Sequence, residues 1–203
     1  VALAGSGAAL TLGWWQDSAE ATVEGTPWFA GYVDVTATPS YAFEAPAGEG
    51  TQAAVLAFVV AAADGSCTPS WGASYGLDQA ASDLDLDRRI ARLRDQGRSV
   101  VVSFGGQRND ELALRCASVA DLTAAYASVV DRYRLDTIDL DIEGAALADA
   151  ASGQRRAEAI AALQEARRAA GKDLAVWLTL PVVTSGLTTQ GTDTVARFLA
   201  AGV

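Results

Sequence analysis

The stretch Asp-Thr-Ile-Asp-Leu-Asp-Ile-Glu-Gly, residues 136–144, decides the fold of this chain. Successive side chains of a strand point to opposite faces, so the apolar residues at 138, 140 and 142 share one face. Asp139, Asp141 and Glu143 then share the other face, at a spacing of roughly 6 to 7 Å. If that face looks into a closed barrel of parallel strands, burial raises the pKa of at least one acid, and neighbouring acids share a proton. The stretch therefore predicts an acid row suited to proton transfer, as the cleavage of a glycosidic bond requires.

A second stretch of alternating acids shows why the pattern alone is weak evidence. Residues 83–87 read Asp-Leu-Asp-Leu-Asp, but Leu86, Ile90 and Leu93 have helical spacing. We expect these acids to be cap and first-turn charges at a helix N-terminus. The acid row differs because it follows a helix pattern and ends in Glu-Gly, where a barrel strand delivers side chains to an active site. An edge strand with a solvated acidic face is the alternative.

The composition excludes several classes of function. The chain has 203 residues, half of them hydrophobic, which is enough for one sizeable core. The net charge of −10 and the absence of a basic cluster argue against a nucleic-acid partner. The chain has no His, which excludes Ser/His/Asp and Cys/His catalysis and every His-containing metal site. Carboxylates must therefore perform any acid/base chemistry, and we expect no metal and no cofactor.

The two cysteines, Cys67 and Cys116, are too few for a zinc site made of cysteines alone. Each follows the end of a predicted strand. We expect a disulfide between two loops, and two buried thiols are the alternative.

The N-terminal part, residues 1–27, is expected to lie outside the folded domain. Residues 1–15 are small and apolar and close in a Trp pair, whereas residues 16–27 are polar and read as a linker. Fifteen residues are short of the roughly 20 that span a bilayer. They are interpreted either as the outer end of a membrane anchor, hence a membrane tether, or as a signal-peptide remnant or a packed segment. Because the chain starts at Val1 and contains no Met, we expect it to be a processed or excised piece.

Residues 28–203 alternate between strand and helix patterns, which predicts a parallel α/β sheet with right-handed crossovers. Expected strands cover residues 28–35, 53–62, 99–104, 137–143 and 174–183, and expected helices cover residues 85–96, 119–133, 153–170 and 192–201. Residues 37–52 are rich in Pro, Gly and Ala and offer no helix, so the first crossover is expected to be a loop.

Two motifs together resemble a known family. Asp136-x-x-Asp139-x-Asp141-x-Glu143, preceded by Ser103-Phe104-Gly105-Gly106, is similar to the signature pair of glycoside hydrolase family 18, the chitinases. Supporting segments that are similar to bacterial secreted members are residues 28–36, 67–72, 179–182 and 186–188. The resemblance covers about residues 28–203.

The resemblance implies a (β/α)8 TIM barrel with the acid row on the fourth strand. The chain then supplies only the first five or so strands, because a full barrel needs roughly 250 residues. The alternative is a five-stranded open sheet complete as it stands, in which the acid row would meet helices. The resemblance also implies an extracellular or cell-surface location.

The resemblance implies a role for each acid. Glu143 resembles the general acid that protonates the glycosidic oxygen and later activates water. Asp141 resembles the residue that orients the N-acetyl group of the substrate, and Asp139 the partner that shares its proton. The implied reaction is retaining, substrate-assisted hydrolysis of β-1,4-N-acetylglucosamine linkages in chitin or its oligosaccharides. The alternatives are an endo-β-N-acetylglucosaminidase acting on glycans and a sugar-binding or structural protein without hydrolysis.

Further residues are assigned around the acid row. Tyr32 and Ser103 resemble residues that line the bottom of the cleft and support the acids, although Tyr32 as plain core is an alternative. Trp71 is expected in a loop after the second strand, where its face stacks on a sugar or has no role. Asp136 has the opposite strand parity and is assigned a structural role. The paired glycines Gly105 and Gly106 allow a close backbone approach, to a ligand or within a tight turn.

Overall fold

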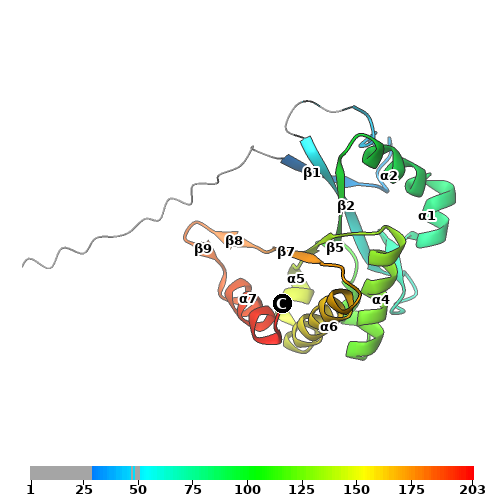
Figure 1. Ribbon diagram of the computed structural model, residues 1–203. Coiled ribbons are helices and arrows are strands. Elements are labelled where there is room, and N and C mark those ends of the chain that lie inside the picture. The colour runs from blue at the N-terminus through cyan, green and yellow to red at the C-terminus, as the bar shows by residue number, and fades with distance from the viewer. Residues whose placement is uncertain (1–28, 47, 49–50) are drawn as a thin grey trace, which may run out of the picture.

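Five parallel strands form the body of a seven-stranded sheet in the computed structural model, which describes residues 29–46, 48 and 51–203 (Figure 1). In spatial order the strands are β1 (Phe29–Asp34), β2 (Thr51–Ala61), β5 (Ser99–Gly105), β6 (Thr137–Asp141) and β7 (Ala175–Thr179). All five were predicted within a few residues, apart from the C-terminal end of the last. The prediction for residues 1–27, and the start of the first strand at residue 28, lie outside the described residues. No helix in the described ranges is long and apolar enough to span a membrane.

The last predicted strand, 174–183, is divided in two. β7 ends at Thr179, and the chain continues into a hairpin of β8 (Val182–Val183) and β9 (Gly186–Leu187). The prediction was too long because Pro181 has no N–H with which to extend the ladder.

A small antiparallel extension was not predicted. β3 (Pro69–Trp71) pairs with the last residues of β2 and with β4 (Tyr75–Gly76). Its start lies two residues after Cys67, whose predicted disulfide with Cys116 is present, with a Cα–Cα distance of 4.6 Å. The bridge ties the loop after β2 to the end of a short helix that follows β5.

The predicted helices are all present, with three short additions. The long helices are α2 (Leu86–Asp95), α4 (Val119–Arg132), α6 (Ala150–Ala169) and α7 (Thr189–Ala201). The additions are α1 (Leu77–Asp83), α3 (Leu112–Arg115) and α5 (Gly144–Ala148). α4 packs beside α6, and α6 packs beside α7, so the three helices together cover the outer face of the sheet (Figure 1). Their apolar stripes meet outward-facing strand residues such as Val102, Phe104, Ile138 and Leu140, which are all buried.

The acids of residues 83–87 lie at the junction of α1 and α2. Asp87 is in the first turn of α2 and Asp85 is its N-cap residue, as predicted. The side chain of Asp85 makes no cap hydrogen bond, however, and instead accepts from Nε of Arg88 at 2.8 Å. The prediction for Asp83 was wrong, because this residue ends α1, a helix that the sequence pattern did not reveal.

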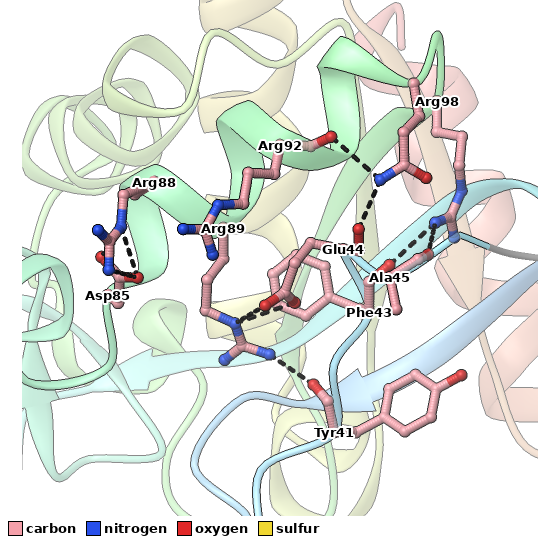
Figure 2. A network of polar contacts seen from close by, with 10 residues as sticks. Tyr41, Phe43, Glu44, Ala45, Asp85, Arg88, Arg89, Arg92 and Arg98 are labelled. Carbon is pink, nitrogen blue, oxygen red and sulfur yellow. Dashed lines mark hydrogen bonds and ion pairs between the residues drawn. The ribbon is translucent and has the colours of Figure 1, made fainter.

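The connection between β1 and β2 is a loop without a helix, as predicted. This loop packs against α2 (Figure 2). Arg89 donates from Nε to both carboxylate oxygens of Glu44 at 3.1 Å and from its terminal nitrogen to the carbonyl of Tyr41. The guanidinium of Arg89 also lies 4.4 Å from the centroid of the Phe43 ring. Arg98 donates to the carbonyl of Phe43 at 2.9 Å. These contacts, called here the loop network, hold the loop on the outside of the sheet.

Candidate active site

The acid row lies at the carboxyl end of β6, between β5 and β7. Asp139 is fully buried and Asp141 is 6% exposed. β6 ends at Asp141, but Glu143 retains an extended backbone (φ −130°, ψ 169°) and is the N-cap residue of α5. The alternation of side chains therefore continues through Glu143, which is partly exposed. The edge-strand alternative is wrong, because β6 has a parallel neighbour on each side.

Three hydroxyl groups from three other strands surround the carboxylate of Asp139. Ser103 on β5 donates to its Oδ2 at 2.6 Å, and Thr179 on β7 donates to its Oδ1 at 2.8 Å. Tyr32 on β1 donates to Oδ2 at 3.2 Å. A buried carboxylate needs such partners, because an unpaired charge in the interior is strongly disfavoured. Tyr32 and Ser103 thus lie beside the acids, where the sequence analysis placed them.

Tyr32 also shows how strongly the sheet curls. Its hydroxyl lies 2.9 Å from Oγ1 of Thr179, so side chains of β1 and β7, the first and last parallel strands, meet across the inner face. Burial is the main cause that raises the pKa of Tyr32. The acid row thus faces side chains of the same sheet, as in a barrel. The open sheet with helices against the acid face is therefore wrong.

Asp141 has the most perturbed environment of the three acids. Burial first, and then the charges of Glu143 and Asp139, raise its pKa to about 7. Its Oδ1 atom is buried and has no hydrogen-bond partner among the residues that the structure describes. Near neutral pH this side chain is therefore poised between its acid and its base form, with one oxygen open to a further partner.

The paired glycines bring β5 against the acid strand. Gly105 and Gly106 have φ values of +98° and +85°, and the N–H of Gly106 donates to the carbonyl of Asp141 at 2.9 Å. A Cβ on Gly105 would lie 2.3 Å from that same carbonyl oxygen, and one on Gly106 would lie 3.0 Å from the ring of Phe58. The close approach that the glycines allow is thus to the backbone of Asp141 and to Phe58.

Two neighbours of the site were not singled out from the sequence. Thr179 donates to Asp139 and lies within hydrogen-bond distance of the Tyr32 hydroxyl. It begins the segment 179–182 that supported the family resemblance, but it was not assigned to the site. Phe58 contacts Gly106, but it lies within a continuous apolar run that gave no sign of this.

Trp71 does not face the site, and its prediction as a sugar platform was wrong. Its side chain is fully buried, and Nε1 donates to the hydroxyl of Tyr133 at 2.9 Å. The two rings meet edge to face, with centroids 5.8 Å apart. The reason is β3, which pairs Trp71 with Val59 of β2 and so draws it into the core.

Asp136 lies just before β6, with its side chain 92% exposed and 3.5 Å from Arg167. Its carbonyl accepts from the N–H of Ala175 at 2.8 Å and so starts the pairing of β6 with β7. Within residues 29–46, 48 and 51–203, no group of three or more acidic or cysteine side chains is arranged to hold a metal ion.

Curated proteins of similar sequence are chitinases by name. Over 148 residues the chain is 40% identical to a probable bifunctional chitinase/lysozyme of Escherichia coli (strain K12), covering 73% of this chain and 16% of that protein. Over 149 residues it is 38% identical to endochitinase 11 of Metarhizium anisopliae, covering 73% of this chain and 27% of that protein. Over about three quarters of its length the chain is therefore similar in sequence to proteins named as chitinases. No protein-family model matches the chain.

Solved structures support the same fold. Active domain 2 of the chitinase from Pyrococcus furiosus aligns with a TM-score of 0.73 at 24% identity, covering 87% of this chain and 54% of that one. The catalytic domain of a family GH18 chitinase from the fern Peteris ryukyuensis aligns with a TM-score of 0.58 at 17% identity, covering 85% of this chain and 64% of that one. The fold of this chain is therefore similar to that of these chitinase domains, of whose lengths the chain spans 54% and 64%.

Proposed function

We propose that the acid row hydrolyses β-1,4-N-acetylglucosamine linkages in chitin or chito-oligosaccharides. The observation on which this rests is Asp141, buried between two other acids with a pKa of about 7 and with one oxygen unpartnered. The chitinase names of the relatives support the substrate class, and the chain spans 16% and 27% of the lengths of those two proteins.

Glu143 is the proposed general acid, because it is the partly exposed end of the row and is placed to meet a ligand. It protonates the glycosidic oxygen as the bond to the anomeric carbon breaks. The acetamido oxygen of the substrate attacks that carbon, so the enzyme needs no nucleophile of its own. Glu143 then removes a proton from the water that opens the cyclic intermediate, which gives net retention of configuration.

Asp141 is the proposed partner of the acetamido group. In its protonated form it shares a proton with its neighbours, and as the acetamido nitrogen becomes positive its charged form stabilises that nitrogen. Asp139 is held by hydrogen bonds from Ser103, Thr179 and Tyr32 and is the proposed partner that takes up the proton when Asp141 becomes charged.

The test is hydrolysis of a fluorogenic chitotriose glycoside by the full-length protein that carries this chain, beside a matched glucosamine glycoside without acetyl groups. We expect turnover of the acetylated substrate alone. Comparable turnover of both would rule out the acetamido mechanism. Binding of chito-oligosaccharides without any turnover would favour a sugar-binding protein instead.

The disulfide supports an extracellular or cell-surface location, because such bonds persist in oxidising compartments. Protein recovered from the culture medium with the bridge intact would agree with this location. Recovery of all of it from the cytosol with free thiols would contradict it.

A further inference from the structure

A buried charged cluster lies behind the acid row, on the outer side of the sheet. Glu111, Tyr126 and Arg156 are 2%, 0% and 1% exposed. Arg156 donates from two nitrogens to Oε2 of Glu111, at 3.0 and 2.7 Å, and the hydroxyl of Tyr126 donates to Oε1 at 2.5 Å. The N–H of Ala113 donates to Oε2 as well, at 2.8 Å. These three side chains come from the loop after β5, from α4 and from α6, and are called here the rear cluster.

The rear cluster lies close to the backbone that bears the acids. A Cβ placed on Gly105 would lie 3.2 Å from Cγ of Glu111 and 2.3 Å from the carbonyl oxygen of Asp141, so Glu111 lies next to this junction. On the other side, the terminal nitrogen of Arg156 lies 3.4 Å from the carbonyl of Ala146 in α5. Because α5 begins directly after Glu143, one guanidinium links the loop after β5 to the helix that Glu143 starts.

Stability alone does not account for such a cluster. A buried ion pair is often no more stabilising than apolar side chains of the same volume, because both charges lose their hydration. What a planar guanidinium provides is direction, since its donors are fixed in a rigid fork. Here that fork points at a carboxylate beside Asp141 and at the helix that follows Glu143.

We infer that Glu111, Tyr126 and Arg156 are positioning residues that set the direction of the Glu143 and Asp141 carboxyls. The inference rests on the proposed function, because it names the residues that hold the carboxyls of that site in their catalytic positions. The side chain of Glu143 makes no cap hydrogen bond to α5, but it shares a hydrogen bond with Asp141, so a shift of the backbone beside the rear cluster displaces the two carboxyls together. A carboxyl displaced by a fraction of an ångström loses rate far more than it loses affinity.

The test is the neutral double variant Glu111→Gln with Arg156→Met in the full-length protein. Gln keeps an acceptor for the N–H of Ala113, and Met fills the space of the arginine stem without leaving an unpaired charge. We expect a folded protein in which kcat on chitotriose falls by about 10- to 100-fold while KM changes little. Should the double variant not fold, Tyr126→Phe keeps the ring packed on Phe104 and removes only the hydroxyl, with an expected loss in kcat of a few-fold.

The loop network supplies the matched control. Glu44 and Arg89 form a comparable pair with side chains 16% and 9% exposed, but the hydrogen bonds of Arg89 go to Glu44 and Tyr41 in the loop between β1 and β2 (Figure 2). Glu44→Gln with Arg89→Met is therefore expected to lower thermal stability and to leave kcat unchanged. An equal loss of kcat in both double variants would mean a general effect of stability and would overturn the inference.

A second readout separates this inference from the proposed function. Carboxyl-labelled aspartate allows the titration of Asp141 to be followed by NMR without any substrate. We expect the rear-cluster variant to shift this titration and the control variant to leave it in place. If the wild type does not hydrolyse chitotriose, the proposed function fails, and the titration alone decides whether the cluster positions the acids. Wild-type kcat and an unchanged titration in the folded double variant would overturn the inference.

Discussion

The chain contains two runs of alternating acids, and the fold uses them in opposite ways. In residues 83–87, Asp85 is exposed at the start of α2, and hydrogen bonds from Arg88 lower its pKa. In residues 139–143, Asp141 is buried in the sheet without any cation, and burial raises its pKa to about 7. The same sequence pattern thus gives an acid with a lowered pKa in one place and a proton-sharing acid with a raised pKa in the other. Environment decides the chemistry, and the pattern only provides the groups.

The largest expected difference between the two runs is in catalysis at their last acids. Glu143→Gln removes the proposed proton donor and is expected to lower kcat by about 10²- to 10⁴-fold, with oligosaccharide binding retained. Asp87→Asn is the matched control, because it neutralises an acid that pairs with Arg132 at the surface. Steady-state kinetics on chitotriose and calorimetric binding measure both. Full activity in the Glu143 variant would refute its role.

A smaller effect is expected at the middle acids. Asp141→Asn keeps the shape of the side chain but can no longer become negative, so we expect kcat to fall by about 10²-fold. Asp85→Asn, at the corresponding place of the other run, should leave kcat unchanged. If the Asp141 variant has the activity of the Asp85 variant, the two runs do not differ as proposed.

The two runs should also differ in the pH dependence of stability. Because the pKa of Asp141 is raised in the folded state, the native protein holds a proton that the unfolded chain releases above about pH 4. The contribution of this group to the free energy of unfolding should therefore decrease as the pH rises from about 4 to about 7. Urea denaturation across this range should show a flatter profile for Asp141→Asn than for the wild type. Identical profiles would mean that Asp141 is not protonated in the native state.

The smallest effect is expected from Asp85→Asn on stability. The pKa of Asp85 is lowered, so its contribution is present above the unfolded pKa of about 4 and is lost only as the pH falls below it. Since the ion pair with Arg88 is exposed to solvent and screened by it, we expect almost no change in the free energy of unfolding at neutral pH. Thermal denaturation measures it, and a drop of several degrees would show that this run is more than a surface feature.

Local pattern was enough to predict the five parallel strands and the acid row, whereas their arrangement as part of a barrel came from the family resemblance. Strand parity placed Asp139, Asp141 and Glu143 on one side, and the positions of Tyr32 and Ser103 followed from the family resemblance. Strand parity and the family motifs can both be recognised within short stretches of the sequence.

What could not be predicted depends on contacts between distant residues. The pairing of Glu111 with Arg156 joins residues 45 apart in the chain, and nothing local to either residue announces it. Trp71 was misplaced for the same reason, because its hydrogen-bond partner Tyr133 lies 62 residues away. Burial of polar groups is a property of the assembled sheet and its helices, which periodicity does not contain.

The most direct test of the account is the configuration of the first product. Proton NMR of chitotetraose hydrolysis by the full-length protein distinguishes the anomers as they form, before mutarotation. The account predicts the β-anomer, because two displacements at the anomeric carbon, the first by the acetamido oxygen, retain configuration. Release of the α-anomer, or no hydrolysis by a folded protein, would contradict the claim that the buried acid row performs substrate-assisted cleavage.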